Sequence, residues 1–535
     1  MHPYVAEEFT DAEAAVLRRY FTNLEGPVFA LVNLPEVVKG ALFARYSRSS
    51  KSLRRLFLDE FVGDLELAGD TSIDATVGLH RADDLYQKIF FEYGDDSVAQ
   101  LGGVHLACEQ ASNLLTKILE RGRLMSYLEQ STRYLGYDRR LSNGLYRFYR
   151  DNDLLESRFG ARYIGEMDRM FDTYRELLPI LTEWLALKYP KTATDTDFVY
   201  RQAIRAKALD GLRGLLPASA LSNLGIYASG QAYEALLLRM RAHALPEVRD
   251  YAQMMLDELV KVIPSFLRRL DVPERGVAWT NYLRDTRSAT SALLLDLEHD
   301  VHHEPPGEYV RLVAFDPEGE VRVLEAIVFA NSTTSHNEAA RRVKAMNKLE
   351  RAALLSTYVG QRGNRRHRPG RAFERTDYRF EIMSDYGAFR DLQRHRLLTI
   401  EWQPLTADLG FDVPEVVLEA GLAERYQESL LRSADLFNEV REEFPDQAQY
   451  CVALAFRIRY VMQMNAREAM HLIELRSGPQ GHPSYRRIAH EMVRLIREKA
   501  GHGGIATAME YVDFSETDLE RLEAERAAER SRLNR

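Results

Sequence analysis

The stretch ASNLLTKILERGRLMS at residues 111–126 has a counterpart in the second half of the chain, SDYGAFRDLQRHRLLT at residues 384–399. The two stretches align without a gap, and residues of the same kind recur 273 positions apart. The matching pairs are Lys117 with Arg390, Leu119 with Leu392, Arg121 with Arg394, Arg123 with Arg396 and Leu124 with Leu397. Self-similarity at a fixed offset indicates an internal repeat.

A second pair of stretches, EALLLRMR at 234–241 and HLIELRSG at 471–478, aligns with an offset of 237 and places Arg239 opposite Arg476. The motifs follow the same order in both halves, which indicates two diverged copies of one domain. The segment at 297–308, rich in His, Pro and acidic residues, is the predicted linker. The predicted division is 1–300 for the first copy with an N-terminal extension, 308–515 for the second copy and 516–535 for a charged C-terminal helix.

Apolar residues at three- and four-residue spacings predict a mostly helical chain. The predicted helices cover 97–134, 155–190, 196–240, 247–270, 335–358, 418–445, 447–476 and 484–501. Two β-rich runs that flank the turn sequence DPEG predict a hairpin over 308–330, and TDYRFEIMS at 376–384 predicts a further strand.

Composition limits the class of protein. A chain of 535 residues with 45% hydrophobic and 28% charged residues is expected to fold as two or more globular domains. The net charge of −9 argues against a protein that coats nucleic acid. No apolar run is long enough to cross a bilayer and the N-terminus lacks the pattern of a signal peptide, so a cytoplasmic protein is expected.

The two cysteines and one basic stretch need separate interpretations. Cys108 and Cys451 lie far apart in the sequence and are expected to be small buried hydrophobes, with no disulfide framework and no metal site. The basic stretch RGNRRHRPGR at 362–371 could be an RNA-facing loop or a solvated loop, and the solvated loop is favoured.

A dense polar cluster follows the first repeat motif. Glu129, Ser131 and Arg133 occupy alternate positions, which on a helix would not share a face, so the cluster is expected on a loop or turn. Ser and Thr at 131 and 132 favour a turn as well. Arginine and short hydroxyl donors are the groups that bind a nucleotide phosphate, so the cluster is a candidate nucleotide site.

These motifs resemble the flavin-dependent thymidylate synthases. The first copy keeps much of the family hallmark, with Gly122 in place of its His and Leu128 in place of its Asn. The second copy keeps the Arg-His-Arg and loses the residues that follow it. The stretches DGLRGLLP at 210–217 and MNAREAMHLIELR at 464–476 resemble later motifs of the family.

The resemblance implies an α+β fold, as two tandem copies of a mostly helical domain with a small antiparallel sheet. It implies FAD as cofactor, NADPH and methylenetetrahydrofolate as co-substrates, and no catalytic nucleophile. The implied substrate-binding residues are Glu129, Ser131, Arg133, Arg213, Arg394 and Arg476. The implied cofactor-binding residues are Arg394, His395, Arg396, Asn465, Arg467 and His471.

The two copies have lost different parts of the implied site. The first copy keeps the nucleotide loop and Arg213, with Ala228 and Gly230 at the positions of the family's Asn-x-Arg. The second copy keeps Asn465 and Arg467, with Gln449 in place of the first copy's Arg213. This pattern predicts a composite site that holds dUMP mainly by the first copy and FAD mainly by the second.

The predicted function is C5 methylation of dUMP by a homodimer that imitates the family tetramer. Asp391 stands where the family has a Gln that helps to hold dUMP. The alternatives are a divergent flavin-dependent enzyme for another uridine nucleotide, and a catalytically inactive nucleotide-binding scaffold.

Overall fold

The computed structural model describes residues 4–34, 36–62, 100, 102–193, 195–297, 307, 309–516 and seven positions of the C-terminal segment, 519, 521, 522, 525, 526, 529 and 530. The predicted linker and most of the predicted C-terminal helix lie outside these residues.

The chain forms two compact units, and each takes a segment from the other half of the sequence. Unit 1 consists of Met1–Glu176, Leu215–Pro305 and Leu431–Ala453, and unit 2 of Leu177–Gly214, Pro306–Leu430 and Leu454–Arg535. The division of the sequence into two copies at 300 and 308 stays a prediction about ancestry, because the compact units are interleaved along the chain.

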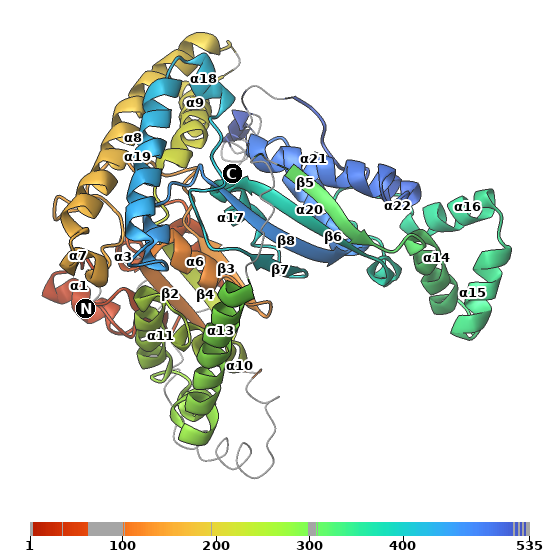
Figure 1. The fold of residues 1–535 in the computed structure, drawn as a ribbon, viewed down its shortest axis with the longest axis horizontal. Coiled ribbons are helices and arrows are strands. Elements are labelled where there is room, and N and C mark those ends of the chain that lie inside the picture. The colour runs from red at the N-terminus through yellow and green to blue at the C-terminus, as the bar shows by residue number, and fades with distance from the viewer. Residues whose placement is uncertain are drawn as a thin grey trace. The chain divides into compact units, whose positions relative to one another are not determined.

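Each unit contains one four-stranded antiparallel sheet, and the two sheets have the same topology (Figure 1). Unit 1 has the order β1-β2-β4-β3, formed by β1 (Val28–Leu31), β2 (Gly103–Ser112), β3 (Met125–Glu129) and β4 (Leu221–Ser229). Unit 2 has the order β5-β6-β8-β7, formed by β5 (Tyr309–Phe315), β6 (Asp377–Asp385), β7 (Thr399–Trp402) and β8 (Arg457–Asn465). The α+β class and the tandem arrangement are confirmed.

Helices flank the sheets and follow the strands in the same order in both units. Unit 1 contains α1 (Asp11–Leu17), α2 (Glu36–Tyr46), α3 (Leu53–Glu60), α6 (Asn113–Leu119), α7 (Asn152–Glu156), α10 (Gly230–Arg241), α11 (Pro246–Leu259), α12 (Pro264–Leu267) and α13 (Ala278–Leu297). Unit 2 contains α9 (Asp197–Leu212), α14 (Gly319–Ala330), α15 (His336–Ala345), α16 (Lys348–Val359), α17 (Tyr386–Leu392), α18 (Glu415–Glu419), α20 (Ala466–Arg476), α21 (Pro483–Glu498) and α22 (Gly503–Ala508). Both α8 (Gly160–Lys188) and α19 (Ala423–Val440) contribute residues to each unit.

Helix caps fix the alignment of the two copies. Ser112 caps α6 and Asp385 caps α17, which agrees with the offset of 273. Ser229 caps α10 and Asn465 caps α20, which gives an offset of 236. The sequence-based offset of 237 is therefore wrong by one residue, and Ser229, not Ala228, is the counterpart of Asn465. One residue rotates a helix face by about 100°, so this correction decides which side chains of α10 correspond to those of α20.

Several predicted elements are wrong because buried strands and helices both appear as continuous apolar runs. The predicted helix over 97–134 is β2, α6 and β3, and the long helices over 196–240 and 447–476 are interrupted by β4 and β8. The predicted strand at 376–384 is confirmed by β6.

The predicted hairpin over 308–330 is wrong in its second half. Residues 319–330 form α14, which buries Val323, Leu324 and Ile327 along one face. Spacings of three and four outweigh the β propensity of these residues, because burial of a helix face contributes more than local preference.

The N-terminal segment packs against the first sheet. Its apolar core includes Leu17, Phe29, Leu42, Leu56 and Phe57, all essentially without exposure to solvent. This core lets β1 act as an edge strand that extends the sheet beyond β2.

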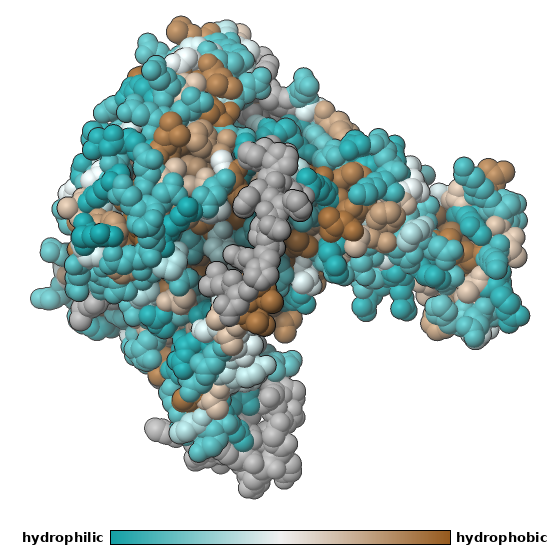
Figure 2. Space-filling view, in the orientation of Figure 1, coloured by the Kyte–Doolittle hydropathy of each residue, from teal (hydrophilic) through white to brown (hydrophobic). Residues whose placement is uncertain are grey.

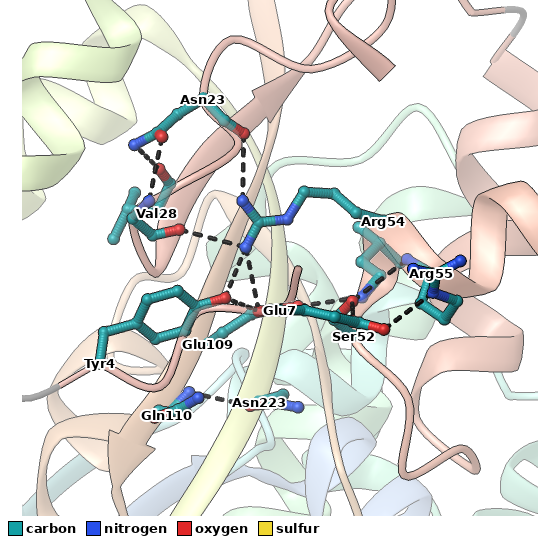
Figure 3. Close-up of polar contacts among 12 residues, drawn as sticks. Tyr4, Glu7, Asn23, Val28, Ser52, Arg54, Arg55, Glu109, Gln110 and Asn223 are labelled. Carbon is teal, nitrogen blue, oxygen red and sulfur yellow. Dashed lines mark hydrogen bonds and ion pairs between the residues drawn. The ribbon is translucent and has the colours of Figure 1, made fainter. Parts of the chain in front are cut away.

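A buried charged network joins this segment to β2 (Figure 3). The Glu109 carboxylate accepts hydrogen bonds from the hydroxyls of Tyr4 at 2.8 Å and Tyr46 at 3.0 Å, and from Leu53 N at 2.9 Å. Arg54 lies 3.4 Å from the same carboxylate, and both side chains are buried. The charges are compensated inside the protein, so removal of one partner would leave the other unpaired.

The helices α14, α15 and α16 form a lobe of unit 2 whose visible surface is largely hydrophilic (Figure 2). Exposed apolar side chains on it, such as Phe329 and Leu349, are isolated. No helix within the described part of the chain combines the length and apolar character needed to span a membrane.

Candidate functional site

The centre of the candidate site in unit 2 is His395, which follows α17 and is 7% exposed. Its Nδ1 lies 3.1 Å from Glu468 Oε1, and Arg476 Nε donates a hydrogen bond to its Nε2 at 3.0 Å. Because a guanidinium can only donate, Nε2 must be the acceptor and the ring proton must be on Nδ1, where it is donated to Glu468. The contacts therefore specify one neutral tautomer.

Burial lowers the pKa of His395 well below its ordinary value, and the Arg476 guanidinium lowers it further. Burial also raises the pKa of Glu468 to about 7, against the opposing effect of Arg368 and other nearby guanidiniums. Both shifts favour uncharged forms. The pair can thus exchange a proton close to neutral pH while the imidazole stays uncharged.

The helix α20 positions these groups. The Asn465 side chain accepts a hydrogen bond from Glu468 N at 2.9 Å and so caps the helix. Glu468 and His471 are three residues apart and share a face. The His471 ring lies 5.5 Å from the His395 ring.

Donor atoms of His395, Glu468 and His471 lie within 4.8 Å of one another, a spacing that a metal ion could use. In this arrangement both ring nitrogens of His395 are occupied by hydrogen bonds. A metal would need the lone pair that Arg476 uses, so the trio is arranged as a hydrogen-bonded cluster.

The basic stretch at 362–371 borders this site. Burial lowers the pKa of His471 to about 4, and the guanidiniums of Arg368 and Arg365 are the next causes. Arg362 anchors the stretch, since it pairs with both Glu474 oxygens at 2.6 Å and donates to Ala508 O at 2.6 Å. The sequence-based choice between an RNA-facing and a solvated loop is replaced by a loop whose charges act on the cluster.

Two further arginines meet at Asp391. Arg213 Nη1 donates to Asp391 Oδ2 at 3.2 Å, and Arg394 Nη2 donates to Asp391 Oδ1 at 2.5 Å. Arg213 ends α9, in the segment that belongs to unit 2, although the sequence assigned it to the nucleotide half. One carboxylate therefore holds two guanidiniums close together, an arrangement suited to an anion.

The other cofactor-binding candidates of unit 2 lie around the cluster. Arg467 donates from Nε to Pro369 O at 2.8 Å, which connects α20 to the basic stretch. Arg396 is exposed and adds to the positive potential at Glu468.

In unit 1 the predicted nucleotide loop follows β3. Glu129 ends the strand and Ser131 and Arg133 lie in the turn beyond it, as the spacing predicted. Ser131 Oγ accepts from Arg133 N at 3.2 Å. Lys117 Nζ donates to Glu129 Oε2 at 3.0 Å in a buried pair, so the Glu129 carboxylate is held by the protein itself.

Sequence reasoning missed Glu468, Arg365 and Arg368. Arg365 and Arg368 carried a signal, since the basic stretch was noticed, but its distance in sequence from the second repeat motif hid its position. Glu468 follows Asn-x-Arg directly and carried no signal of its own.

These features define a class of protein: a duplicated α+β domain that gathers guanidiniums around a neutral imidazole, as a phosphorylated ligand requires. The model of the Thy1 family, described as thymidylate synthase complementing protein, matches residues 41–265 and 311–501. The chain belongs to this family, and the match to one segment in each half agrees with a tandem duplication.

Relatives extend over the whole chain. A UPF0159 protein of Chlamydia muridarum is 39% identical over 525 residues, 97% of this chain and 98% of the relative. The UPF0159 protein Ta1429 of Thermoplasma acidophilum is 33% identical over 514 residues, 91% of this chain and 97% of the relative.

Among solved structures, the UMP/dUMP methylase PolB of Streptomyces cacaoi is 15% identical to this chain. The match covers 38% of this chain and 96% of that chain, with a TM-score of 0.29. Membership of the Thy1 family supports a methyltransferase-type enzyme of the thymidylate synthase kind.

Proposed function

We propose that this protein is a flavin-dependent thymidylate synthase-type enzyme that methylates dUMP at C5. Methylenetetrahydrofolate is the carbon donor, FAD the cofactor and NADPH the reductant. The observation that carries the proposal is the neutral His395 within a set of guanidiniums, next to a second pair of arginines at Asp391.

The residues of unit 2 fit a flavin diphosphate. Four guanidiniums, those of Arg365, Arg368, Arg467 and Arg476, lower the pKa of the single imidazole of His471. Glu468, with its pKa raised to about 7, only partly balances them. A site with this excess of guanidinium charge requires an anion, and a diphosphate provides two negative charges at the right separation for paired arginines.

Each group of residues has a distinct task in this proposal. Bound FAD in its reduced form supplies hydride. The guanidiniums near His471 bind the diphosphate, and His395, fixed as one tautomer by Glu468 and Arg476, packs beside it without adding a competing positive charge. Arg213 and Arg394 bind the nucleotide phosphate.

The first copy contributes the remaining nucleotide contacts. Ser131 and Arg133 lie in a turn whose base is fixed by the Lys117–Glu129 pair. A homodimer of chains then provides the four domains of the family tetramer, and a closed symmetric dimer is the simplest assembly.

The test is FAD titration by absorbance and fluorescence, followed by tritium release from [5-³H]dUMP. His395→Ala is expected to weaken FAD binding, and Arg133→Ala to raise the dUMP KM while FAD binding is retained. Arg341→Ala, whose side chain is 76% exposed on α15, is the matched control. Equal loss of FAD binding in both site variants would contradict the division of tasks.

A second candidate is C5 modification of another uridine nucleotide. Asp391 favours it, because a carboxylate engaged by two arginines cannot present an amide to the pyrimidine as the family's Gln does. The same assay with UMP in place of dUMP distinguishes the two substrates. A purified protein that stays colourless after reconstitution with FAD would support the inactive scaffold.

A further inference from the structure

Unit 1 contains a pocket at the position that the His395 cluster occupies in unit 2. The offsets of 273 and 236 make Gly122, Ala232 and Ala235 the counterparts of His395, Glu468 and His471. All three small residues line a pocket of about 1090 Å³. Two imidazoles and a carboxyl are thus replaced by one hydrogen atom and two methyl groups, which leaves space.

The wall of this pocket is repacked around the glycine. A Cβ on Gly122 would lie 2.5 Å from Met125 Sδ and 2.6 Å from the Tyr127 hydroxyl. The Tyr127 hydroxyl donates to Gly122 O at 3.0 Å, which fixes the contact. A histidine cannot return here without displacement of both side chains, so the pocket is built differently from the site in unit 2.

The pocket has an excess of positive charge. Its charged lining consists of Arg121, Arg123, Arg239, Arg269 and Arg275 with Glu234 and Glu274. Arg269 pairs with both oxygens of Glu234 at 2.5 and 2.6 Å, so that carboxylate is already neutralised. No described residue forms an ion pair or hydrogen bond with the Arg239 guanidinium.

Two cations converge near Arg239. Burial lowers the pKa of Arg239, and the neighbouring Arg121 guanidinium lowers it further. Arg121 also helps to lower the pKa of His243, which burial brings to about 4. Two guanidiniums that repel each other at a desolvated wall are stabilised by an anion between them.

The rest of the lining is apolar. Leu124, Leu238 and Trp279 lie along it with the small side chains named above. A volume near 1000 Å³ with a few convergent charges is typical of a site for a small organic ligand.

We propose that this pocket binds a nucleoside monophosphate, with the phosphate between Arg121 and Arg239 and the ring on the apolar wall beside Trp279. The ligand is distinct from the diphosphate cofactor proposed for unit 2. The inference depends only on unit 1 and remains testable if the proposed function is wrong.

The experiment uses Trp279 as a reporter, since the full chain has three tryptophans and Trp184→Phe with Trp402→Phe leaves Trp279 alone. Its emission is titrated with dUMP, UMP, AMP, inorganic phosphate and FAD. A saturable change with the nucleoside monophosphates is expected. Arg239→Gln should weaken it roughly tenfold or more, the effect of one charge-assisted hydrogen bond.

Arg476→Gln in the same background is the matched control, because it removes an arginine at the end of the corresponding helix in unit 2 and should leave the Trp279 titration unchanged. Circular dichroism establishes that each variant is folded. No emission change with any nucleotide, an unaltered affinity in Arg239→Gln, or saturation by FAD would each overturn the proposal. Inorganic phosphate that binds as tightly as dUMP would overturn the role of the apolar wall.

Discussion

Replacement of Glu468 by Gln tests the charge state of the cluster in unit 2. Burial raises the pKa of this carboxyl from 4.5 to about 7 in the folded protein. A group whose folded pKa is raised contributes stability that is fully present below its unfolded pKa and is lost as the pH rises through the folded value. Glu468 should therefore destabilise the protein progressively between about pH 4.5 and pH 7 and above.

The magnitude follows from the shift. One pKa unit corresponds to about 1.36 kcal/mol, so the loss is at most about 3 kcal/mol by pH 8.5. Glu468 is 3% exposed, so solvent screening reduces this figure little. His395 does not compensate, because its pKa is lowered and it stays neutral throughout this range.

Gln at this position keeps a carbonyl that can accept the His395 Nδ1 proton and has no charge to titrate. Glu468→Gln should match the wild type in stability at pH 5 and exceed it at pH 8.5, by several degrees in Tm for a unit of this size. Scanning calorimetry at pH 5, 7 and 8.5 measures the difference. Glu491→Gln, at a more exposed carboxylate on α21, is the control.

The result that would refute this reasoning is a constant difference in Tm between wild type and Glu468→Gln from pH 5 to pH 8.5. It would mean that the carboxyl is already ionised in the folded protein at pH 5, and that the neutral cluster is not the resting state.

Three further perturbations have defined outcomes. Arg54→Ala should lower the free energy of unfolding of unit 1 by about 3–5 kcal/mol, because it leaves the Glu109 charge buried and unpaired; urea denaturation measures it, and a double variant with Glu109→Ala should lose less than the sum of the single losses. Cys108 and Cys451 are buried and burial raises the pKa of both thiols, so Ellman's reagent should detect no thiol in the native protein at pH 8 and two in guanidinium; a rapid native reaction would contradict the burial. Asp391→Gln removes the carboxylate shared by two arginines, and in the proposed enzyme it should lower the dUMP KM several-fold, whereas an unchanged KM would show that these arginines do not bind the phosphate.

The sequence carried enough information to find the repeat, because residues that serve one local structure recur at one offset. The turn at Glu129–Arg133 was also predictable, since alternate polar positions are incompatible with a helix face. The strand at 376–384 was recognised for the same local reason. Secondary structure failed where burial decides, as at α14, whose β-branched residues are held in a helix by the apolar face they bury.

The alignment of the second motif needed the helix caps. Side-chain similarity favoured an offset of 237, but the capping hydrogen bonds of Ser229 and Asn465 require 236. The difference decides whether Ala235 or Glu234 is the counterpart of His471, and only the first reveals that the pocket in unit 1 is the emptied equivalent of the cluster in unit 2.

The sequence by itself determined that two copies of one domain are present and which of their residues are chemically capable of binding nucleotide and flavin. Only the tertiary structure decided that Arg213 joins Arg394 at Asp391, that Glu468 fixes the tautomer of His395 and that the basic stretch acts on His471. The physical reason is that ion pairs and hydrogen bonds depend on distances in space. Segments such as 177–214 and 431–453, which join the unit of the other half, make those distances independent of position in the chain.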